Sequence, residues 1–163
     1  MSDCCEVDTG SEKGTPRCPK CDQSGKKVDP ITVKALLRPK ALATLSAVGH
    51  RFCPTASCPI VYFAVGEAFS TDDVSVPVFQ KEGAGQRTVC YCFQITETDL
   101  RREIEATGES AASARVTAHV KAGRCACEIK NPQGSCCLGN IGVTVTAMAK
   151  IKRAPGVNQP AVD

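Results

Sequence analysis

The chain has 163 residues, which is enough for one ordinary domain or two very small ones, and only 4% of them are aromatic. A large packed core is therefore excluded, and small domains with thin cores commonly need bound metal in order to fold. The formal net charge of +3 counts every cysteine as neutral, whereas two four-thiolate metal sites would each contribute about −2 and cancel it. The charge therefore does not indicate nucleic-acid binding, and no nucleic-acid partner is expected.

The twelve cysteines are the most informative part of the composition. The chain starts with an acidic, polar segment, residues 1–8, and not with the basic and apolar regions of a secretory signal. Its longest apolar stretch, near 60–65, is too short to cross a membrane. We therefore expect a cytoplasmic protein without membrane insertion, whose thiols stay reduced and bind metal rather than pair as disulfides.

The first half of the chain shows a polar start followed by short elements. Residues 1–15 are polar and are predicted to form a flexible tail. Residues 28–37 are apolar with β-branched side chains and predict a strand. Residues 39–45 begin with proline and predict a short helix, and 58–65 predict a second strand.

Two cysteine pairs in this half have the spacing of a metal site. Each close pair bends the backbone so that both sulfurs can reach one ion, and four thiolates with no open position describe a closed, structural zinc site. Iron in a rubredoxin-like site fits the same spacing. His50 is near enough to replace a cysteine ligand but is expected to be a surface histidine. The predicted zinc ligands are Cys18, Cys21, Cys53 and Cys58, and they define a small zinc-ribbon-like β module at 16–86.

The second half of the chain changes from strand to helix signals. Residues 66–87 predict one or two short strands and a linker, with Asp72-Asp73 as a solvated turn. Thr96 to Asp99 form a capping motif, and Gly108 is a stop signal after the helix that follows. Three helices are predicted, at 100–107, 110–121 and 138–150, before a second flexible tail at 153–163.

A second four-cysteine site is predicted in this half. Cys90-Tyr91-Cys92 places two thiolates one residue apart, close enough to bind the same iron, and a two-iron cluster needs four thiolates. The partners arrive after two helices, at Cys127 and Cys137, because those helices fold the chain back on the early pair. Helix N-termini facing the cluster would stabilise its negative charge.

Four stretches carry a resemblance to a known family: Cys18-Pro-Lys-Cys21, Cys53 to Cys58 running into Val61-Tyr62-Phe63, Val89-Cys-Tyr-Cys92, and Cys127 to Cys137. Together they resemble the N-terminal region of CopZ-type copper metallochaperones, in which a zinc module precedes a bacterioferritin-associated-ferredoxin-like [2Fe–2S] domain. The resemblance covers roughly residues 16–150. It implies an α+β fold, with the zinc module followed by a helical [2Fe–2S] module at 87–152.

The resemblance also implies cluster ligands, cofactors and partners. The ligands would be Cys90, Cys92, Cys127 and Cys137, with Cys125 and Cys136 as alternatives in the late segment. The cofactors would be a [2Fe–2S] cluster and Zn²⁺, with Cu⁺ bound transiently. The partners would be a copper or other soft-metal carrier domain or P-type ATPase, and a redox partner.

Two functions from different classes remain open. The first is a metallochaperone component in copper or related soft-metal homeostasis, whose cluster transfers single electrons, for example in reducing Cu(II) to Cu(I). The alternative is a ferredoxin-like electron carrier or regulatory module, which the absence of the family's Met-x-Cys-x-x-Cys loop favours.

Cys4 and Cys5 are either soft-metal capture ligands or thiols without a partner. An enzyme is not expected, apart from cluster-based metal reduction, and His119 is expected to be packed or solvated rather than catalytic.

Overall fold

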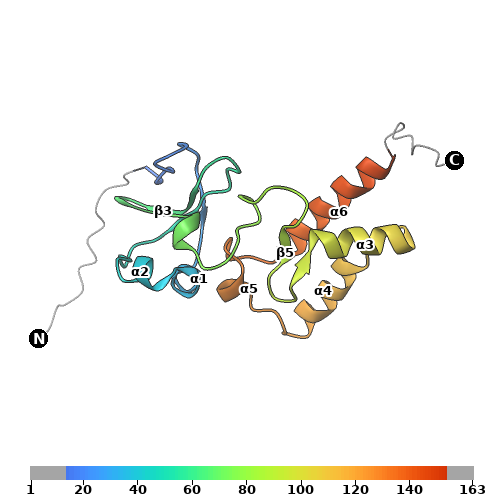
Figure 1. The fold of residues 1–163 in the computed structure, drawn as a ribbon. Helices are drawn as coiled ribbons and strands as arrows, with labels where there is room; N and C mark the ends of the chain where they lie inside the picture. Colours follow the sequence, from blue (N-terminus) through green and yellow to red (C-terminus); the bar gives the residue numbers. More distant parts are fainter. Residues whose placement is uncertain (1–13, 154–163) are drawn as a thin grey trace, which may run out of the picture.

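The computed structural model describes residues 14–153. The tails predicted at 1–15 and 153–163 lie almost entirely outside these residues, and so does the Cys4-Cys5 pair. Figure 1 shows two groups of elements beside each other: a small sheet with short helices, and then a group of longer helices. The expected mixture of helix and sheet is confirmed. No helix within 14–153 has the length and apolar character needed to cross a membrane.

The first group is built on a four-stranded antiparallel sheet in the order β1-β2-β3-β4. Its third strand confirms the strand predicted at 58–65 and is buried from its second residue onward. Gly66, with φ of 77°, makes the tight turn from this strand into the fourth. The strands are β1 (Lys26–Lys27), β2 (Arg51–Phe52), β3 (Ile60–Ala64) and β4 (Glu67–Ser70).

The strand predicted at 28–37 is wrong, because this segment forms helix α1 (Pro30–Leu36). Asp29 caps the helix: its side chain accepts a hydrogen bond from the backbone N–H of Ile31 at 2.9 Å. Pro30 then occupies the first helical turn, where its missing N–H costs nothing. These two start signals outweigh the strand preference of the β-branched residues, and Thr32, Val33 and Leu36 form the buried face.

The short helix predicted at 39–45 is confirmed as α2 (Pro39–Leu42), although it ends three residues earlier. Asp72 and Asp73 lie in a 3-10 turn, η1 (Thr71–Asp73). Ser70 and Asp73 cap that turn reciprocally, which agrees with the predicted turn.

The second group combines a two-stranded ribbon with four helices. The capping motif before the first helix is confirmed, since Thr96 accepts a hydrogen bond from the backbone of Asp99 and Asp99 accepts one in return. Gly108 ends that helix in the left-handed conformation at φ of 89°. The ribbon and the short helix α5 were not predicted. The elements are β5 (Thr88–Cys90), β6 (Ile95–Thr96), α3 (Glu97–Thr107), α4 (Ala112–Lys121), α5 (Cys127–Lys130) and α6 (Leu138–Arg153).

Most buried apolar side chains belong to two cores, the first formed by residues up to Val78 and the second by residues from Phe79 onward. The first core comprises Val28, Val33, Leu36, Leu37, Ala41, Phe52, Val61, Tyr62, Phe69, Val74 and Val78. The second core comprises Phe79, Val89, Cys90, Tyr91, Leu100, Ala112, Val116, Cys127, Cys137 and Ile141. The module boundaries predicted at 16–86 and 87–152 stay predictions, although Phe79 already belongs to the second core.

Hydrogen bonds join the two groups of elements through α5 and the segment that follows it. The Thr32 hydroxyl of α1 donates to the backbone oxygen of Glu128 at 2.6 Å. The Tyr62 hydroxyl of β3 donates to the backbone oxygen of Pro132 at 2.8 Å. The segment that carries the late cysteines is therefore fastened to the first sheet, and not only to its own helices.

Candidate metal centres

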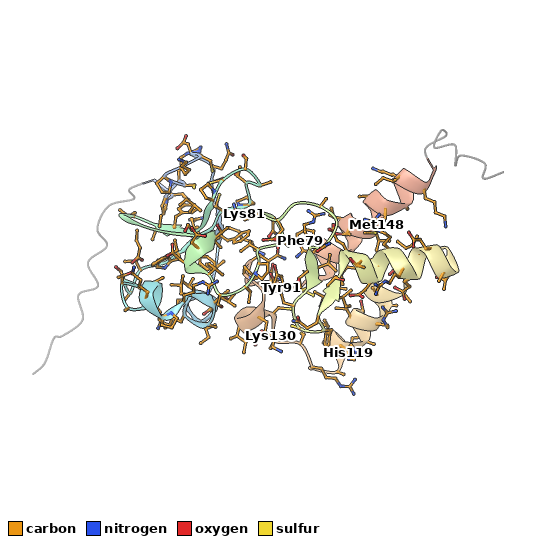
Figure 2. The ribbon with its side chains drawn as sticks, viewed as in Figure 1. Phe79, Lys81, Tyr91, His119, Lys130 and Met148 are labelled. Carbon is orange, nitrogen blue, oxygen red and sulfur yellow. The ribbon has the colours of Figure 1, made fainter. Side chains whose placement is uncertain are left out.

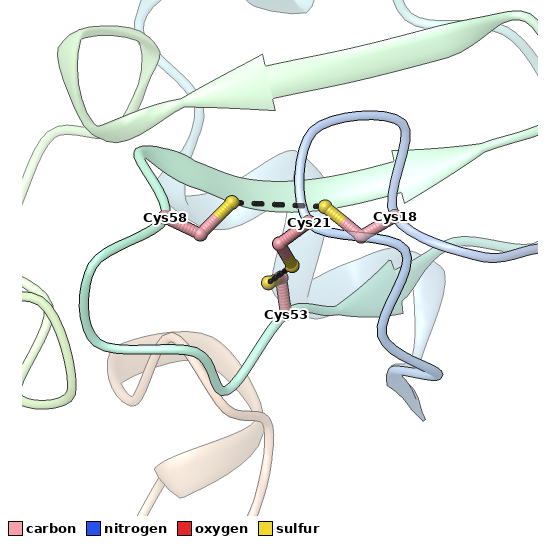
Figure 3. Close-up of side chains that lie close together, drawn as sticks. All are labelled: Cys18, Cys21, Cys53 and Cys58. Carbon is pink, nitrogen blue, oxygen red and sulfur yellow. Dashed lines mark hydrogen bonds between the residues drawn. The ribbon is translucent and has the colours of Figure 1, made fainter.

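The structure brings Cys18, Cys21, Cys53 and Cys58 together, as predicted, with all four sulfur atoms within 4.8 Å of one another. Figure 3 marks two contacts between them, which measure 3.7 Å between the sulfurs of Cys18 and Cys58 and 3.6 Å between those of Cys21 and Cys53. A tetrahedral zinc ion with Zn–S bonds of about 2.3 Å needs sulfur atoms about 3.8 Å apart. The arrangement therefore fits a closed tetrathiolate site.

A tight turn before β1 and the loop between β2 and β3 position these thiols. The backbone oxygen of Cys18 accepts a hydrogen bond from Asp22 N–H at 2.9 Å, and Asp22 adopts the left-handed conformation with φ of 56°. The backbone N–H of Cys53 donates to the backbone oxygen of Val61 at 2.9 Å, and that of Cys58 donates to the backbone oxygen of Thr55 at 3.2 Å. The first pair thus lies in one hydrogen-bonded turn and the second in the loop between β2 and β3, so the backbone positions both sulfurs of each pair.

The thiols differ in how easily they ionise. A hydrogen bond with the Thr55 hydroxyl, which lies 3.4 Å from the sulfur, lowers the pKa of Cys21 to about 6. Burial raises the pKa of Cys58 to about 12 and also raises the pKa of Cys18. Buried thiols with raised pKa values become thiolates when a cation is bound, so metal binding at this site is coupled to proton release.

His50 does not take part in this site, and its predicted surface position is wrong. The ring is only 3% exposed, and its Nε2 lies 2.5 Å from the carboxylate of Glu67. Ser46 donates to the same carboxylate from its backbone N–H at 3.0 Å and from its hydroxyl. The hydrogen-bonded carboxylate compensates for burying the imidazole.

The second set of predicted ligands is also assembled. Cys90, Cys127 and Cys137 are buried in the second core, and Cys92 is half-buried beside it. The sulfur atoms of Cys92 and Cys127 lie 3.6 Å apart. Cys137 lies close enough to Cys90 and Cys127 to change the pKa values of both thiols. The four thiols therefore gather in or against one core and form one connected group, with one direct contact between an early and a late cysteine, Cys92 with Cys127.

Donors surround these thiols, which suits an anionic centre. The backbone N–H of Ala126 donates to the sulfur of Cys92 at 3.3 Å, and the Asn131 amide donates to that of Cys137 at 3.4 Å. The contact with Cys137 lowers the pKa of Cys90 to about 6, and burial raises that of Cys127 to about 12. Hydrogen bonds to sulfur are one of the means by which proteins tune iron–sulfur clusters.

Burial separates the predicted late ligands from their alternatives. Cys127 and Cys137 are 8% and 0% exposed, whereas Cys125 is half-buried and Cys136 is exposed. A buried, hydrogen-bonded thiol is the better ligand for a cluster enclosed by the second core. The assignment of all eight ligands nevertheless stays a prediction. Cys4 and Cys5, the predicted capture ligands, lie outside the described residues.

The surroundings include residues that the sequence interpretation did not single out. In Figure 2, Tyr91 and Phe79 lie near each other at the junction of the two groups of elements. The Tyr91 hydroxyl donates to the backbone oxygen of Pro77 at 2.7 Å and accepts from Phe79 N–H at 2.9 Å. His119 stacks on Phe93 with ring centroids 4.3 Å apart, which agrees with the expectation of a packed side chain. In the sequence, the one sign of the buried, hydrogen-bonded position of Tyr91 is that it stands between two cysteines.

Comparisons with known proteins agree with this arrangement. Residues 15–75 match the zf_CopZ family model, which describes a zinc binding domain. The copper chaperone CopZ of Archaeoglobus fulgidus is 32% identical over 121 residues, covering 74% of this chain and 57% of that protein. This chain thus spans little more than half the length of its curated relative.

The fold is similar to a solved structure as well. The X-ray structure of the Archaeoglobus fulgidus CopZ N-terminal domain matches with a TM-score of 0.63 and 31% sequence identity. The match covers 78% of this chain and 98% of that domain. The zinc-binding family model ends at residue 75, but the match to the solved structure covers 78% of the chain. The likeness therefore extends into the second group of elements. The chain belongs to the CopZ-like family.

Proposed function

We propose that this chain is a zinc- and [2Fe–2S]-binding metallochaperone component in copper or related soft-metal homeostasis. The observation that carries the proposal is the connected group of early and late cysteines in the second core, with Cys92 and Cys127 sulfurs 3.6 Å apart. The group occurs in a chain that matches 98% of a CopZ N-terminal domain. The family match includes a relative named as a copper chaperone, which also agrees with the prediction that the chain is not an enzyme.

The two metal centres would have different roles. Cys18, Cys21, Cys53 and Cys58 would hold zinc as a structural ion, because four thiolates leave no open coordination position. Cys90, Cys92, Cys127 and Cys137 would hold the [2Fe–2S] cluster. The 3.6 Å contact between the Cys92 and Cys127 sulfurs favours these two as ligands of one iron, with Cys90 and Cys137 left for the other, in place of the early pair sharing one iron.

The cluster, when bound, supplies one-electron transfer. One electron converts one Cu(II) ion to Cu(I), the form that thiolate carriers accept, and a redox partner would restore that electron. The residues of this chain exclude water from three ligands and leave Cys92 half-exposed, so electrons would enter and leave on that side. Cu(I) would pass to a soft-metal carrier domain or a P-type ATPase, with Cys4 and Cys5 as candidate capture ligands.

Copper reduction is the direct test. Anaerobic protein would be reduced, freed of reductant and mixed with one equivalent of Cu(II), and Cu(I) would be followed with a chromogenic chelator alongside the visible spectrum of the protein. The matched control is Cys137→Ser, which is expected to lack the cluster but keep zinc, and therefore reports reduction by free thiols alone. The proposal predicts stoichiometric Cu(I) with reoxidation of the wild-type protein only. Equal Cu(I) yields from both proteins would refute it.

The alternative function is a ferredoxin-like electron carrier without metal delivery. The half-exposed Cys92, beside the stacked rings of Phe93 and His119, favours it because this side of the cluster could contact a protein partner. Reoxidation by a protein electron acceptor, together with no reduction of Cu(II), would support this alternative. The Cys4→Ser/Cys5→Ser double variant separates copper capture from reduction in the same assay.

A further inference from the structure

Helix α6 buries two polar side chains that have no hydrogen-bond partner. Asn140 is 6% exposed and Thr144 is 2% exposed. Over residues 14–153, the Asn140 Nδ2 and the Thr144 hydroxyl are the only buried side-chain nitrogen or oxygen atoms without a partner. Buried polar groups in native proteins are nearly always hydrogen-bonded, so a donor in this position points to an acceptor that the polypeptide does not supply.

The position of Asn140 indicates which acceptor that is. Helix α6 begins directly after Cys137, whose backbone oxygen accepts a hydrogen bond from Ile141 N–H at 3.1 Å. Cys137 stands immediately before the helix and Asn140 is its third residue, so Asn140 lies in the first turn, on the buried face of the helix. Ile141, also on this face, is fully buried in the second core with Cys90 and Cys127.

Two further features of this helix end suit an anion. The backbone N–H groups of a first helical turn have no acceptor within the helix, and they carry the positive end of the helix dipole. Asn131 already donates to the sulfur of Cys137 at 3.4 Å from the other side. A second buried amide without a partner, in the first turn of the helix that follows Cys137 and next to Ile141 of the second core, adds a further donor at this end of the core.

We propose that Asn140 donates its side-chain N–H to a sulfur of the bound cluster, either the Cys137 thiolate or a bridging sulfide. The inference rests on the [2Fe–2S] site of the proposed function. Asn140 is a positioning residue here: it is not a ligand, and it sets the reduction potential. One-electron reduction adds a negative charge without forming or breaking a bond, and a donor stabilises the more negative state. Removing the donor therefore lowers the potential.

Thr144 provides a matched control in the same helix. It carries the second partnerless atom, and it lies about one helical turn, or 5.4 Å, further from Cys137. Thr144→Val and Asn140→Leu each replace a buried polar side chain by an apolar one of similar size. A general effect of repacking this helix would appear in both variants, whereas a hydrogen bond to the cluster would appear only in Asn140→Leu.

The test uses the full chain, purified without oxygen, as wild type and both variants. Iron, sulfide and zinc contents are measured first, and the reduction potential is then measured by titration monitored by EPR. We expect Asn140→Leu to be about tenfold harder to reduce at equilibrium, a shift of about 59 mV to lower potential, with Thr144→Val at the wild-type potential and zinc unchanged in all three.

Each result has a defined consequence. An Asn140→Leu protein with a full cluster and the wild-type potential would overturn the inference while the proposed function stands. Equal shifts in both variants would overturn it too, because they indicate a packing effect or a buried water instead of a specific donor. Wild-type protein without iron and sulfide would refute the cluster itself. If Asn140→Leu takes up no cluster, Asn140→Ala removes the donor without adding bulk and is judged by the same potentials.

Discussion

The hydrogen bond between Tyr62 and Pro132 predicts that a change in the first sheet will loosen the second metal centre. Tyr62 is fully buried in β3, and its hydroxyl donates to the backbone oxygen of Pro132 at 2.8 Å. Pro132 is itself buried and lies between Cys127 and Cys137. In Tyr62→Phe that oxygen loses its partner without gaining water, which costs about 1–3 kcal/mol.

The expected effect is on the lifetime of the cluster. A cost of about 1.4 kcal/mol corresponds to a tenfold change in an equilibrium constant, so local opening of the 127–137 segment would become roughly tenfold more frequent. The assay is the loss of visible absorbance when an iron chelator is added without oxygen, with zinc release followed in parallel. Tyr62→Phe should lose the cluster roughly tenfold faster and release zinc at the wild-type rate.

Ser75→Ala is the control for this prediction. The Ser75 hydroxyl donates to the backbone oxygen of Leu36 at 2.9 Å, so this variant also removes one hydrogen bond, but from a contact that does not reach the late cysteines. Its cluster lifetime should match the wild type. A Tyr62→Phe protein with an unchanged cluster lifetime, or one that loses zinc and iron together, would refute the coupling between the two groups of elements.

The remaining predictions concern the ligands and a buried ion pair. Cys137→Ser should abolish the visible absorbance of the cluster, whereas Cys136→Ser should preserve it, because only Cys137 is buried in the second core; equal spectra would contradict the assignment. Cys58→Ser should reduce the zinc content to near zero in elemental analysis while iron is retained. Glu97, 3% exposed, pairs with Arg87; Glu97→Gln should lower the free energy of unfolding at pH 7 by about 3 kcal/mol in urea titrations. Burial raises the pKa of Glu97, but the hydrogen bonds from Arg87 and Gly85 outweigh it and hold the pKa below the ordinary 4.5. The stabilisation is therefore complete above pH 4.5 and lost as the pH falls through the lower, folded-state pKa, so the difference between wild type and Glu97→Gln should shrink only below pH 4.5.

Features that depend on neighbouring residues could be predicted from the sequence. The start and end of α3 follow from Thr96, Asp99 and Gly108, which act within one helical turn. The first metal site could be predicted because the two cysteines of each pair are close in sequence, so one short loop positions both sulfurs. Two such loops together supply the four thiolates of one metal site. Helix α1 also depends on neighbouring residues: Asp29 and Pro30 are local start signals that decide against the strand favoured by the β-branched residues after them.

Features that depend on distant residues could not be predicted. The burial of His50 requires Glu67, which lies on another strand and reaches the ring only when the sheet has formed. The contact of Cys92 with Cys127 requires α3 and α4 to fold the chain back, so the spacing within the early pair does not reveal it. The preference for Cys137 over Cys136 as a ligand likewise depends on which of the two is buried in the fold. Their distances in sequence from the other ligands differ by only one residue, so spacing does not separate them.

The proposed function requires two different metal centres in this chain, one of zinc and one of iron and sulfide. Its most direct test is the metal and acid-labile sulfide content of protein purified without oxygen, together with the visible spectrum and the EPR spectrum after reduction. We expect about one zinc, two iron and two sulfide per chain, with a paramagnetic signal from the one-electron-reduced cluster. Two zinc ions per chain and no sulfide would contradict it.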